Sequence, residues 1–227
     1  MTEAGAGVLG LLGGTFDPLH VGHLRLALEA REALGLSALC LIPAGSPPLR
    51  ALPHCAATQR LGMVECALAG LPGFSVDSGE VLAATDGAAP SYTVATLERL
   101  RRQHGAQRPL VLLLGADAFA RLESWQRWRE LFGLAHIAVA TRPGHDIKVG
   151  AGDTALDGEF RARRGGAADL AGAPAGRIVP FAITALEISA TAIRERLARG
   201  LSVRYLVPDP VLDYIETRQL YRTPHGH

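Results

Sequence analysis

The residues of this chain most able to do chemistry are His20 and His23, which lie three apart within the glycine-rich segment Gly13–His23. An apolar run at 8–12 precedes the segment and predicts a buried strand that ends in a glycine turn. A helix is expected to begin around Val21, where main-chain amides and the positive end of the helix dipole suit a phosphate. The two imidazoles could donate hydrogen bonds to charge that develops on phosphate oxygens. The segment therefore predicts a nucleotide triphosphate site for transfer at a phosphorus atom.

The same segment has other interpretations. A strand, two glycines and a helix fit an ordinary tight turn equally well, because glycine supplies the backbone freedom that such turns need. The glycine spacing differs from the dinucleotide fingerprint G-x-G-x-x-G, and the second apolar run, at 38–42, ends in Pro-Ala-Gly rather than in an acid. The two histidines could form half of a metal site, but no further cluster of cysteine or histidine in the sequence completes it. Zinc is therefore not expected.

A second helix start carries a similar set of polar groups. Ser189 is placed to cap a helix that begins at Ala190. Thr191 and Arg194 then lie on its first two turns, which brings a hydroxyl and a guanidinium to a helix N-terminus. Such a terminus suits a triphosphate or a leaving pyrophosphate. The alternative is an ordinary capped surface helix, which the presence of the first site makes the weaker interpretation.

These residues must be positioned by short strands and helices that alternate along the chain. This alternation predicts the α/β class, a Rossmann-like doubly wound parallel sheet with helices on both faces. The stretch 144–176 is rich in Gly, Ala, Asp and Arg, and we expect a mobile surface segment with at most one short helix there. The expected strands are 8–12, 38–42, 74–76, 80–83, 110–114, 135–140 and 177–181, and the expected helices are 21–34, 57–69, 92–103, short pieces within 118–132, 190–197 and 208–219.

Ligands in such sheets bind outside the carboxyl ends of the strands. Four candidate segments fall at such ends: Gly13–His23, Pro43–Arg50, Gly115–Asp117 and Ile188–Arg194. Their convergence on one edge indicates a site more strongly than any single segment does. Because no internal repeat or linker divides the sequence, we expect one domain over 1–227, with a C-terminal helical part at about 188–220.

Composition narrows the classes of function. Of the 227 residues, 48% are hydrophobic and 20% are charged, as in ordinary globular proteins. The net charge of +1 gives no broad footprint for nucleic acid, so nucleic acid is not an expected partner. The sequence has neither a signal peptide nor an apolar run of about 18 residues, so no membrane association is expected. Three cysteines without C-x-x-C spacing indicate reduced thiols, and we expect a cytoplasmic protein, with the formation of a homo-oligomer left open.

Two motifs resemble a known superfamily. Gly13–His23 contains H-x-G-H and Ile188–Arg194 contains I-S-x-T-x-I-R, and together they resemble the nucleotidyltransferases. Within that superfamily the chain is most similar to the bacterial nicotinate-nucleotide adenylyltransferases, from about Gly10 to Ile215. The further segments that carry this similarity are Pro47-Pro48, Pro90-Ser91-Tyr92-Thr93, Gly115-Ala116-Asp117 with Leu122 and Trp125, His136-Ile137 with Arg142-Pro143-Gly144, and Tyr205-Leu206-Val207-Pro208.

The resemblance implies a reaction in which ATP and nicotinate mononucleotide give nicotinate adenine dinucleotide and pyrophosphate, a step of NAD biosynthesis. The mononucleotide phosphate would attack the α-phosphorus of ATP in line, so catalysis requires positioning and charge stabilisation rather than a protein nucleophile. Mg²⁺ would enter with ATP and keep several waters, with no metal held by the protein itself. The family pattern makes His20, His23 and Arg194 catalytic, and it assigns ATP binding to Gly13, Gly14, Thr15, Phe16, Gly115, Asp117, Ile188, Ser189, Thr191 and Arg194.

The resemblance also implies a nicotinate side of the site. Trp125 would stack its indole on the pyridinium ring, a cation–π contact of roughly 1–2 kcal/mol when desolvated. Tyr92, Thr93 and Arg50 would complete the substrate-binding residues. Trp125 could instead serve only in packing, although Trp128 is the preferred core tryptophan.

The sequence departs from the family pattern at two places. Leu49 stands where a histidine is usual, and Ala95 stands where an aspartate is frequent. Neither departure touches the H-x-G-H motif or the I-S-x-T-x-I-R motif. The implied activity is therefore kept. We expect the two departures to alter only local contacts outside the two motifs.

Other functions remain as alternatives. A related nucleotidyltransferase could act on nicotinamide mononucleotide, phosphopantetheine or an alcohol phosphate. A regulator could bind nucleotide without catalysis, although both histidines and Arg194 are present. A detached aminoacyl-tRNA synthetase core also shares an H-x-G-H turn, but the net charge of +1 and the lack of a K-M-S-K-S-like loop argue against it.

Overall fold

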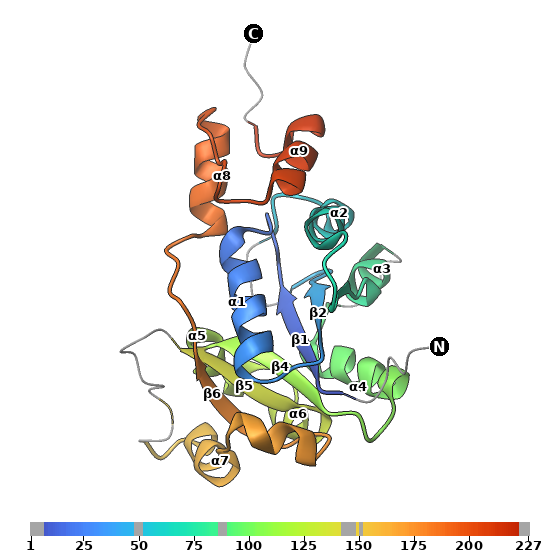
Figure 1. Cartoon of the computed structure of the whole chain (residues 1–227), viewed down its shortest axis with the longest axis vertical. Coiled ribbons are helices and arrows are strands. Elements are labelled where there is room, and N and C mark those ends of the chain that lie inside the picture. Colours follow the sequence, from blue (N-terminus) through green and yellow to red (C-terminus); the bar gives the residue numbers. More distant parts are fainter. Residues whose placement is uncertain (1–6, 48–51, 86–89, 142–148, 150–151, 223–227) are drawn as a thin grey trace. The chain divides into compact units, whose positions relative to one another are not determined.

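Among the described residues, six strands form one sheet in the order β3-β2-β1-β4-β5-β6 (Figure 1). The computed structural model describes residues 7–47, 52–85, 90–141, 149 and 152–222. This strand order is that of doubly wound nucleotide-binding sheets, and the predicted α/β class is confirmed. The strands are β1 (Leu9–Gly14), β2 (Ala38–Pro43), β3 (Phe74–Val76), β4 (Leu110–Gly115), β5 (His136–Thr141) and β6 (Ile178–Ala182).

Helices alternate with the strands along the chain, and most begin within one or two residues of the predicted positions. The α-helices are α1 (Val21–Ala33), α2 (Ala57–Leu68), α3 (Gly79–Thr85), α4 (Thr93–His104), α5 (Ala116–Phe119), α6 (Leu131–Leu134), α7 (Ala155–Arg163), α8 (Ala190–Ala198) and α9 (Asp209–Thr217). Short 3₁₀ helices lie at Leu122–Ser124, Trp128–Glu130 and Ala167–Gly172. None of the described helices is both long enough and apolar enough to cross a lipid bilayer.

Contacts divide the chain into two compact units, each assembled from three separate stretches of sequence. The first unit comprises Met1–Gly13, Leu26–Cys40 and Tyr92–Ala185. Within it, β1, β4, β5 and β6 pair in parallel, and the apolar side chains of β4 are buried. Parallel strands covered on both faces require such continuous apolar runs. This unit therefore owes its core to the runs that the sequence marks most clearly.

The second unit comprises Gly14–Arg25, Leu41–Ser91 and Leu186–His227. Its helices α2 and α9 lie side by side (Figure 1). A Cβ atom built at Gly62 of α2 would lie 2.5 Å from the Tyr214 hydroxyl oxygen of α9. Glycine at this position is thus what allows the two helices to approach so closely. The predicted helical C-terminal part is present as α8 and α9.

The prediction of a strand at 80–83 is wrong, because these residues belong to α3. The Asp77 side chain accepts a hydrogen bond from the main-chain N–H of Gly79 at 3.1 Å and so supports the start of the helix. Val81 is buried, whereas Leu82 is 56% exposed. The run is apolar in composition but has one buried face at helical spacing, so periodicity over four residues could not separate helix from strand.

The expectation of at most one short helix over 144–176 is also wrong for the part that the structure describes. Residues 152–176 contain α7 and a 3₁₀ helix, Ala167–Gly172. Thr154 caps α7 by accepting a hydrogen bond from the main-chain N–H of Asp157. Leu156 and Phe160, four apart, are both buried. A few well-spaced apolar residues and one capping box outweigh a composition rich in Gly and Ala.

Candidate functional site

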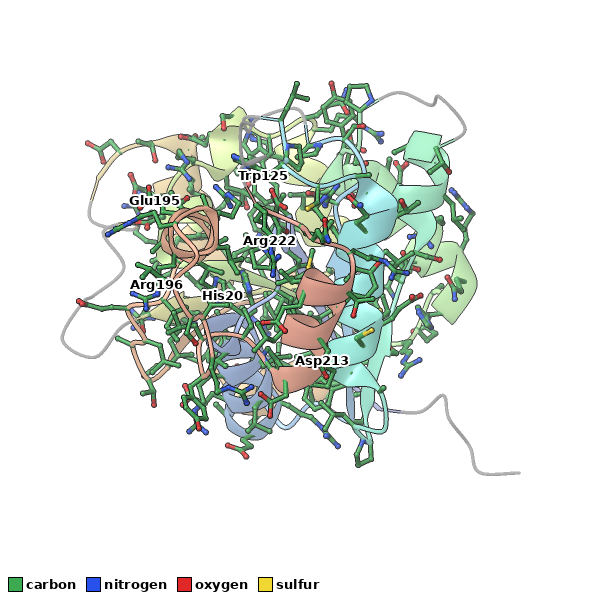
Figure 2. The ribbon with its side chains drawn as sticks, turned by 90° about the horizontal axis from the view of Figure 1, so that it is seen from above. His20, Trp125, Glu195, Arg196, Asp213 and Arg222 are labelled. Atoms are coloured by element: carbon green, nitrogen blue, oxygen red, sulfur yellow. The ribbon has the colours of Figure 1, made fainter. Side chains whose placement is uncertain are left out.

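The two histidines of the H-x-G-H motif lie against each other at the start of α1. Figure 2 labels His20. Their ring centroids are 3.7 Å apart and their planes differ by 25°. His20 is buried, whereas His23 is only partly buried. The ring of Phe16 meets His23 edge-on, with centroids 5.0 Å apart. The motif thus builds a packed aromatic cluster in the second unit.

Two glycines make room for this cluster. A Cβ atom at Gly14 would lie 2.7 Å from the ring of Phe16, which is closer than any real Cβ contact. A Cβ atom at Gly22 would lie 3.1 Å from the ring of His20 and 3.8 Å from Cβ of Ile188. The glycine of H-x-G-H therefore leaves room for the first imidazole, which any larger residue would crowd, and Ile188 of the second motif lies beside it.

Hydrogen bonding sets the roles of the ring nitrogens. The main-chain N–H of His20 donates to Nδ1 of His23 at 3.2 Å. When His23 is neutral, its ring proton must then be on Nε2, which makes Nε2 a donor. The main-chain N–H of Val21 donates to the carbonyl oxygen of Leu206 at 2.9 Å, so this first helical amide is already used by the protein. The imidazoles are thus better placed than that amide to meet a ligand.

His20 has an unusual electrostatic position. Burial lowers the pKa of His20 to about 4, so the ring is neutral near pH 7. Its Nδ1 atom is buried and makes no hydrogen bond within the described part of the chain. Buried polar atoms in proteins are nearly always hydrogen-bonded, and an exception calls for an explanation. A ligand that forms a hydrogen bond with this ring would explain why Nδ1 has no partner in the ligand-free protein.

The second motif reaches the same turn. Ser189 caps α8 as predicted, because its side chain accepts a hydrogen bond from the N–H of Ala192. Nη1 of Arg194 donates to the main-chain carbonyl oxygen of Asp17 at 2.7 Å, and Nη2 donates to Oγ1 of Thr191 at 3.2 Å. Figure 2 shows α8 through its labelled residues Glu195 and Arg196. The fold therefore brings the guanidinium of one motif onto the turn that carries the histidines of the other.

Sequence reasoning missed two residues that hold this turn. Asp17 is buried, and Oδ2 of its carboxylate accepts a hydrogen bond from the main-chain N–H of His54 at 2.7 Å. Arg60 is only 1% exposed, and Nη1 of its guanidinium donates to the carbonyl oxygen of Thr15 at 2.7 Å. Arg60 also donates to the carbonyl oxygen of Gly45 at 2.9 Å. Asp17 stood inside the motif and could have been noticed, whereas nothing around Arg60 in the sequence marks it.

The predicted second loop also belongs to this unit. The main-chain N–H of Ala44 donates to the carbonyl oxygen of Gly14 at 2.9 Å, which joins the loop to the histidine turn. Beside it lies an open cavity of about 420 Å³. Arg50, the predicted cation of this loop, lies outside the described residues, and so does Leu49. The cavity is lined by Gly45, Ser46, Pro47, Leu52, Pro53, Cys55, Ala56, Ala57, Thr58, Arg60, Ala84, Thr85 and Pro90.

The other predicted site residues belong to the first unit. Asp117 is exposed on α5, directly after the end of β4. Trp125, labelled in Figure 2, is partly buried at the end of a 3₁₀ helix, and Trp128 is buried as predicted for the core tryptophan. Of the remaining residues, Gly13 is the second-last residue of β1 and Gly115 is the last residue of β4. Tyr92 is the N-cap of α4, and Thr93 is its first residue. The second unit thus contains nine of the predicted residues, and the residues just described belong to the first unit. The nine are Gly14, Thr15, Phe16, His20, His23, Ile188, Ser189, Thr191 and Arg194.

Comparison with known proteins places this arrangement in a class. Residues 11–196 match the model of the cytidylyltransferase-like family. The match spans most of the chain and includes both motifs. The chain therefore belongs to the cytidylyltransferase-like family, and its fold is that of a nucleotidyltransferase.

Closer relatives define the family. The chain is 55% identical over 217 residues to a protein of Dechloromonas aromatica (strain RCB) named "Probable nicotinate-nucleotide adenylyltransferase", with 94% of this chain and 97% of the relative covered. A protein of the same name from Laribacter hongkongensis (strain HLHK9) is 48% identical, with 95% and 94% covered. The chain belongs to the nicotinate-nucleotide adenylyltransferase family.

A solved structure agrees on the fold. Nicotinic acid mononucleotide adenylyltransferase of Plasmodium falciparum, complexed with NaAD, matches with a TM-score of 0.68 over 94% of this chain and 97% of that chain. Sequence identity is 15%, so this likeness bears on the architecture and not on individual residues.

Proposed function

We propose that the protein transfers the adenylyl group of ATP to nicotinate mononucleotide, which yields nicotinate adenine dinucleotide and pyrophosphate in NAD biosynthesis. Membership of the nicotinate-nucleotide adenylyltransferase family supports the choice of reaction. The observation that carries the proposal is the 2.7 Å hydrogen bond from Arg194 to Asp17, which joins the two phosphate-binding motifs. Both motifs are needed at one polyphosphate, and this contact supports that arrangement.

The residues of the second unit act on the phosphates. An oxygen of the mononucleotide phosphate attacks the α-phosphorus of ATP, and the bond from that phosphorus to the bridging oxygen breaks as pyrophosphate leaves. His23 donates through Nε2 to the phosphate oxygens on which charge develops. His20, whose ring is buried and neutral in the ligand-free protein, contacts the same phosphates through a ring nitrogen. Arg194, with Thr191 and Ser189, holds the β- and γ-phosphates.

The remaining predicted residues complete the site. Asp117 contacts the ATP ribose, and Gly13, Gly14, Thr15, Phe16, Gly115 and Ile188 line the ATP site. Trp125 stacks on the nicotinate ring, an interaction its partial exposure permits. Tyr92 and Thr93 begin a helix and can offer a hydroxyl or a main-chain amide to the ring carboxylate. Arg50 completes the substrate-binding residues as the cation of the second loop.

Mg²⁺ enters as part of the MgATP substrate. The described residues contain no group of three or more His, Cys, Asp or Glu side chains that could hold a metal ion. A magnesium ion that keeps several waters and takes phosphate oxygens as its other ligands fits such surroundings. When bound with ATP, the ion would supply positive charge that offsets the charge of the phosphates.

A pyrophosphate-release assay with ATP and each of the two pyridine mononucleotides tests the function. We expect turnover with nicotinate mononucleotide to exceed turnover with nicotinamide mononucleotide, and the product to be nicotinate adenine dinucleotide by mass. A preference for the amide would overturn the choice of substrate. Binding of ATP without release of pyrophosphate would favour the non-catalytic regulator instead.

The variant His23→Ala tests the site within the same assay. We expect kcat to fall on the order of 10²-fold, as loss of one charge-stabilising donor commonly does. The KM for ATP should change little, because the donor acts mainly in the transition state. An unchanged kcat would remove His23 from the active site.

A further inference from the structure

We propose that Tyr221 is a positioning residue, whose hydroxyl fixes Asp17 and, through the main chain of Asp17, sets the orientation of Arg194. This inference rests on the proposed function, because the role of Arg194 on the phosphates comes from there. Tyr221 lies near the C-terminus of the chain, 204 residues from Asp17 in sequence. Only the tertiary structure brings the two together.

Asp17 is the point at which three distant segments meet. Oδ1 of its carboxylate accepts a hydrogen bond from the Tyr221 hydroxyl at 2.7 Å, and Oδ2 accepts the bond from the N–H of His54. Its carbonyl oxygen accepts the bond from Arg194. Asp17 is only 4% exposed, and a buried carboxylate needs such partners to compensate for lost hydration. The side-chain bonds therefore determine where the carbonyl oxygen lies.

Tyr221 is itself held firmly. The chain turns after α9 through Gln219 and Tyr221, both of which have positive φ angles, 50° and 61°. Between them Leu220 is buried, and its N–H donates to the carbonyl oxygen of Ile215 in α9. The Tyr221 hydroxyl oxygen also lies 3.9 Å from the sulfur of Met63 in α2. Figure 2 marks the course of this segment through Asp213 on α9 and Arg222 beyond it.

The phenol remains a donor across the working range of pH. Burial raises the pKa of Tyr221 well above its usual value, and the hydrogen bonds with Cys55 and Asp17 raise it further. The hydroxyl proton is therefore available to the carboxylate whenever the enzyme is folded. This agrees with the 2.7 Å separation, which is typical of O–H···O hydrogen bonds to a charged acceptor.

Loss of the hydroxyl would leave Oδ1 of Asp17 without this donor in a buried place. The carboxylate would then shift toward other donors or water, and the carbonyl oxygen of the same residue would move with it. Arg194 would lose its preferred orientation, although the described structure shows no hydrogen bond between Arg194 and Tyr221. A displacement of about 1 Å in a positioning group can cost up to 10²-fold in rate.

The test compares Tyr221→Phe with the matched control Tyr205→Phe, in the otherwise wild-type protein and in an Arg194→Ala background. Tyr205 is 83% exposed, so its hydroxyl makes a fair control for the chemical change. We expect Tyr221→Phe to lower kcat on the order of tenfold and to raise the KM for ATP about threefold, because Arg194 no longer meets the phosphates correctly. Tyr205→Phe should match the wild type.

The double variant decides whether Tyr221 acts through Arg194. In the Arg194→Ala background, Tyr221→Phe should change neither kcat nor the KM for ATP by more than about twofold. Equal effects in both backgrounds would overturn the inference, since they would indicate a structural role alone. So would a fall in kcat with an unchanged KM for ATP, which is what a loss of folded enzyme produces.

Folding is controlled in the same series. Circular dichroism melting curves fix an assay temperature at which every variant is folded, and the kinetic comparison is made there. If wild-type protein turns over nicotinate mononucleotide and Tyr221→Phe equals Tyr205→Phe, the positioning role fails and the proposed function stands. If wild-type protein releases no pyrophosphate, the proposed function fails instead.

Discussion

His20 shows how much one residue's surroundings alter its chemistry. An exposed imidazole titrates near pH 6.5, whereas burial lowers the pKa of His20 to about 4. Its neighbour His23 is fixed in one tautomer by the N–H of His20 itself. Two residues of the same type, three apart, thus differ in burial and in hydrogen bonding, and the difference comes from local packing rather than from residue identity.

The lowered pKa predicts a stability that depends on pH. Above about pH 6.5, His20 is neutral in both folded and unfolded protein and contributes no pH dependence. Between about 6.5 and 4 the unfolded chain binds a proton that the folded protein does not, so stability falls as pH falls, by about 3 kcal/mol in total. Below pH 4 both states are protonated and the loss is complete.

Urea unfolding from pH 7 to pH 4 checks this, with His20→Gln as the control that cannot titrate. As pH falls, the unfolding free energy of the wild type should decrease relative to that of His20→Gln. Parallel curves would show that the ring is not buried in solution.

Replacement of Trp125 should affect the two substrates differently. For Trp125→Ala we expect the KM for nicotinate mononucleotide to rise about tenfold, because the stacking contact contributes roughly 1–2 kcal/mol when desolvated. The KM for ATP should rise much less. Trp125→Phe retains an aromatic face and should recover part of the loss. Equal increases in both KM values would assign Trp125 to folding.

At the scale of elements, close helix packing holds the second unit together. α9 packs closely against α2 at Gly62. In the segment that follows α9, the Tyr221 hydroxyl donates a hydrogen bond to the Asp17 carboxylate. α8 begins at a serine cap that places Thr191 and Arg194 on its first two turns. The elements that matter for the site are therefore short helices whose ends, rather than whose faces, carry the polar groups.

Gly62→Ala is expected to destabilise the protein by about 1–3 kcal/mol, the usual cost of overpacking. The added Cβ would lie 2.5 Å from the Tyr214 hydroxyl oxygen and 2.8 Å from the carbon that bears it. Adding Tyr214→Phe removes the nearest atom but not the ring, so part of the stability should return. Thermal melts of the single and double variants measure this, with Gly158→Ala as control because a Cβ there meets nothing within 4 Å. A Gly62→Ala melt equal to that of the control would contradict the packing.

For the whole molecule, the effect of removing metal ions distinguishes Mg²⁺ that binds with ATP from a metal ion that the folded protein itself holds. We expect EDTA to abolish pyrophosphate release and added Mg²⁺ to restore it, because the proposed reaction uses MgATP as its substrate. The melting temperature of the ligand-free protein should not change with EDTA, since the described residues offer no cluster of metal ligands. A melting temperature that falls with EDTA would indicate a metal bound by the protein itself.

Much of this protein follows from sequence alone. Long apolar runs predict buried strands because a parallel sheet needs them on both faces, and Ser189 marks a helix start because its side chain satisfies an otherwise unpaired amide. The weak predictions concerned short or sparse segments. At 80–83 four residues were too few for periodicity, and over 152–176 burial of Leu156 and Phe160 outweighed composition.

The tertiary structure decided which distant residues meet. Arg60, Asp17 and Tyr221 hold the histidine turn through hydrogen bonds that span 45 to 204 residues of sequence. No local pattern encodes such contacts, because a hydrogen bond depends on where two chain segments lie in space and not on what surrounds each one in sequence. The motifs therefore supplied the candidate phosphate-binding groups, and the fold alone determined what holds those groups in place.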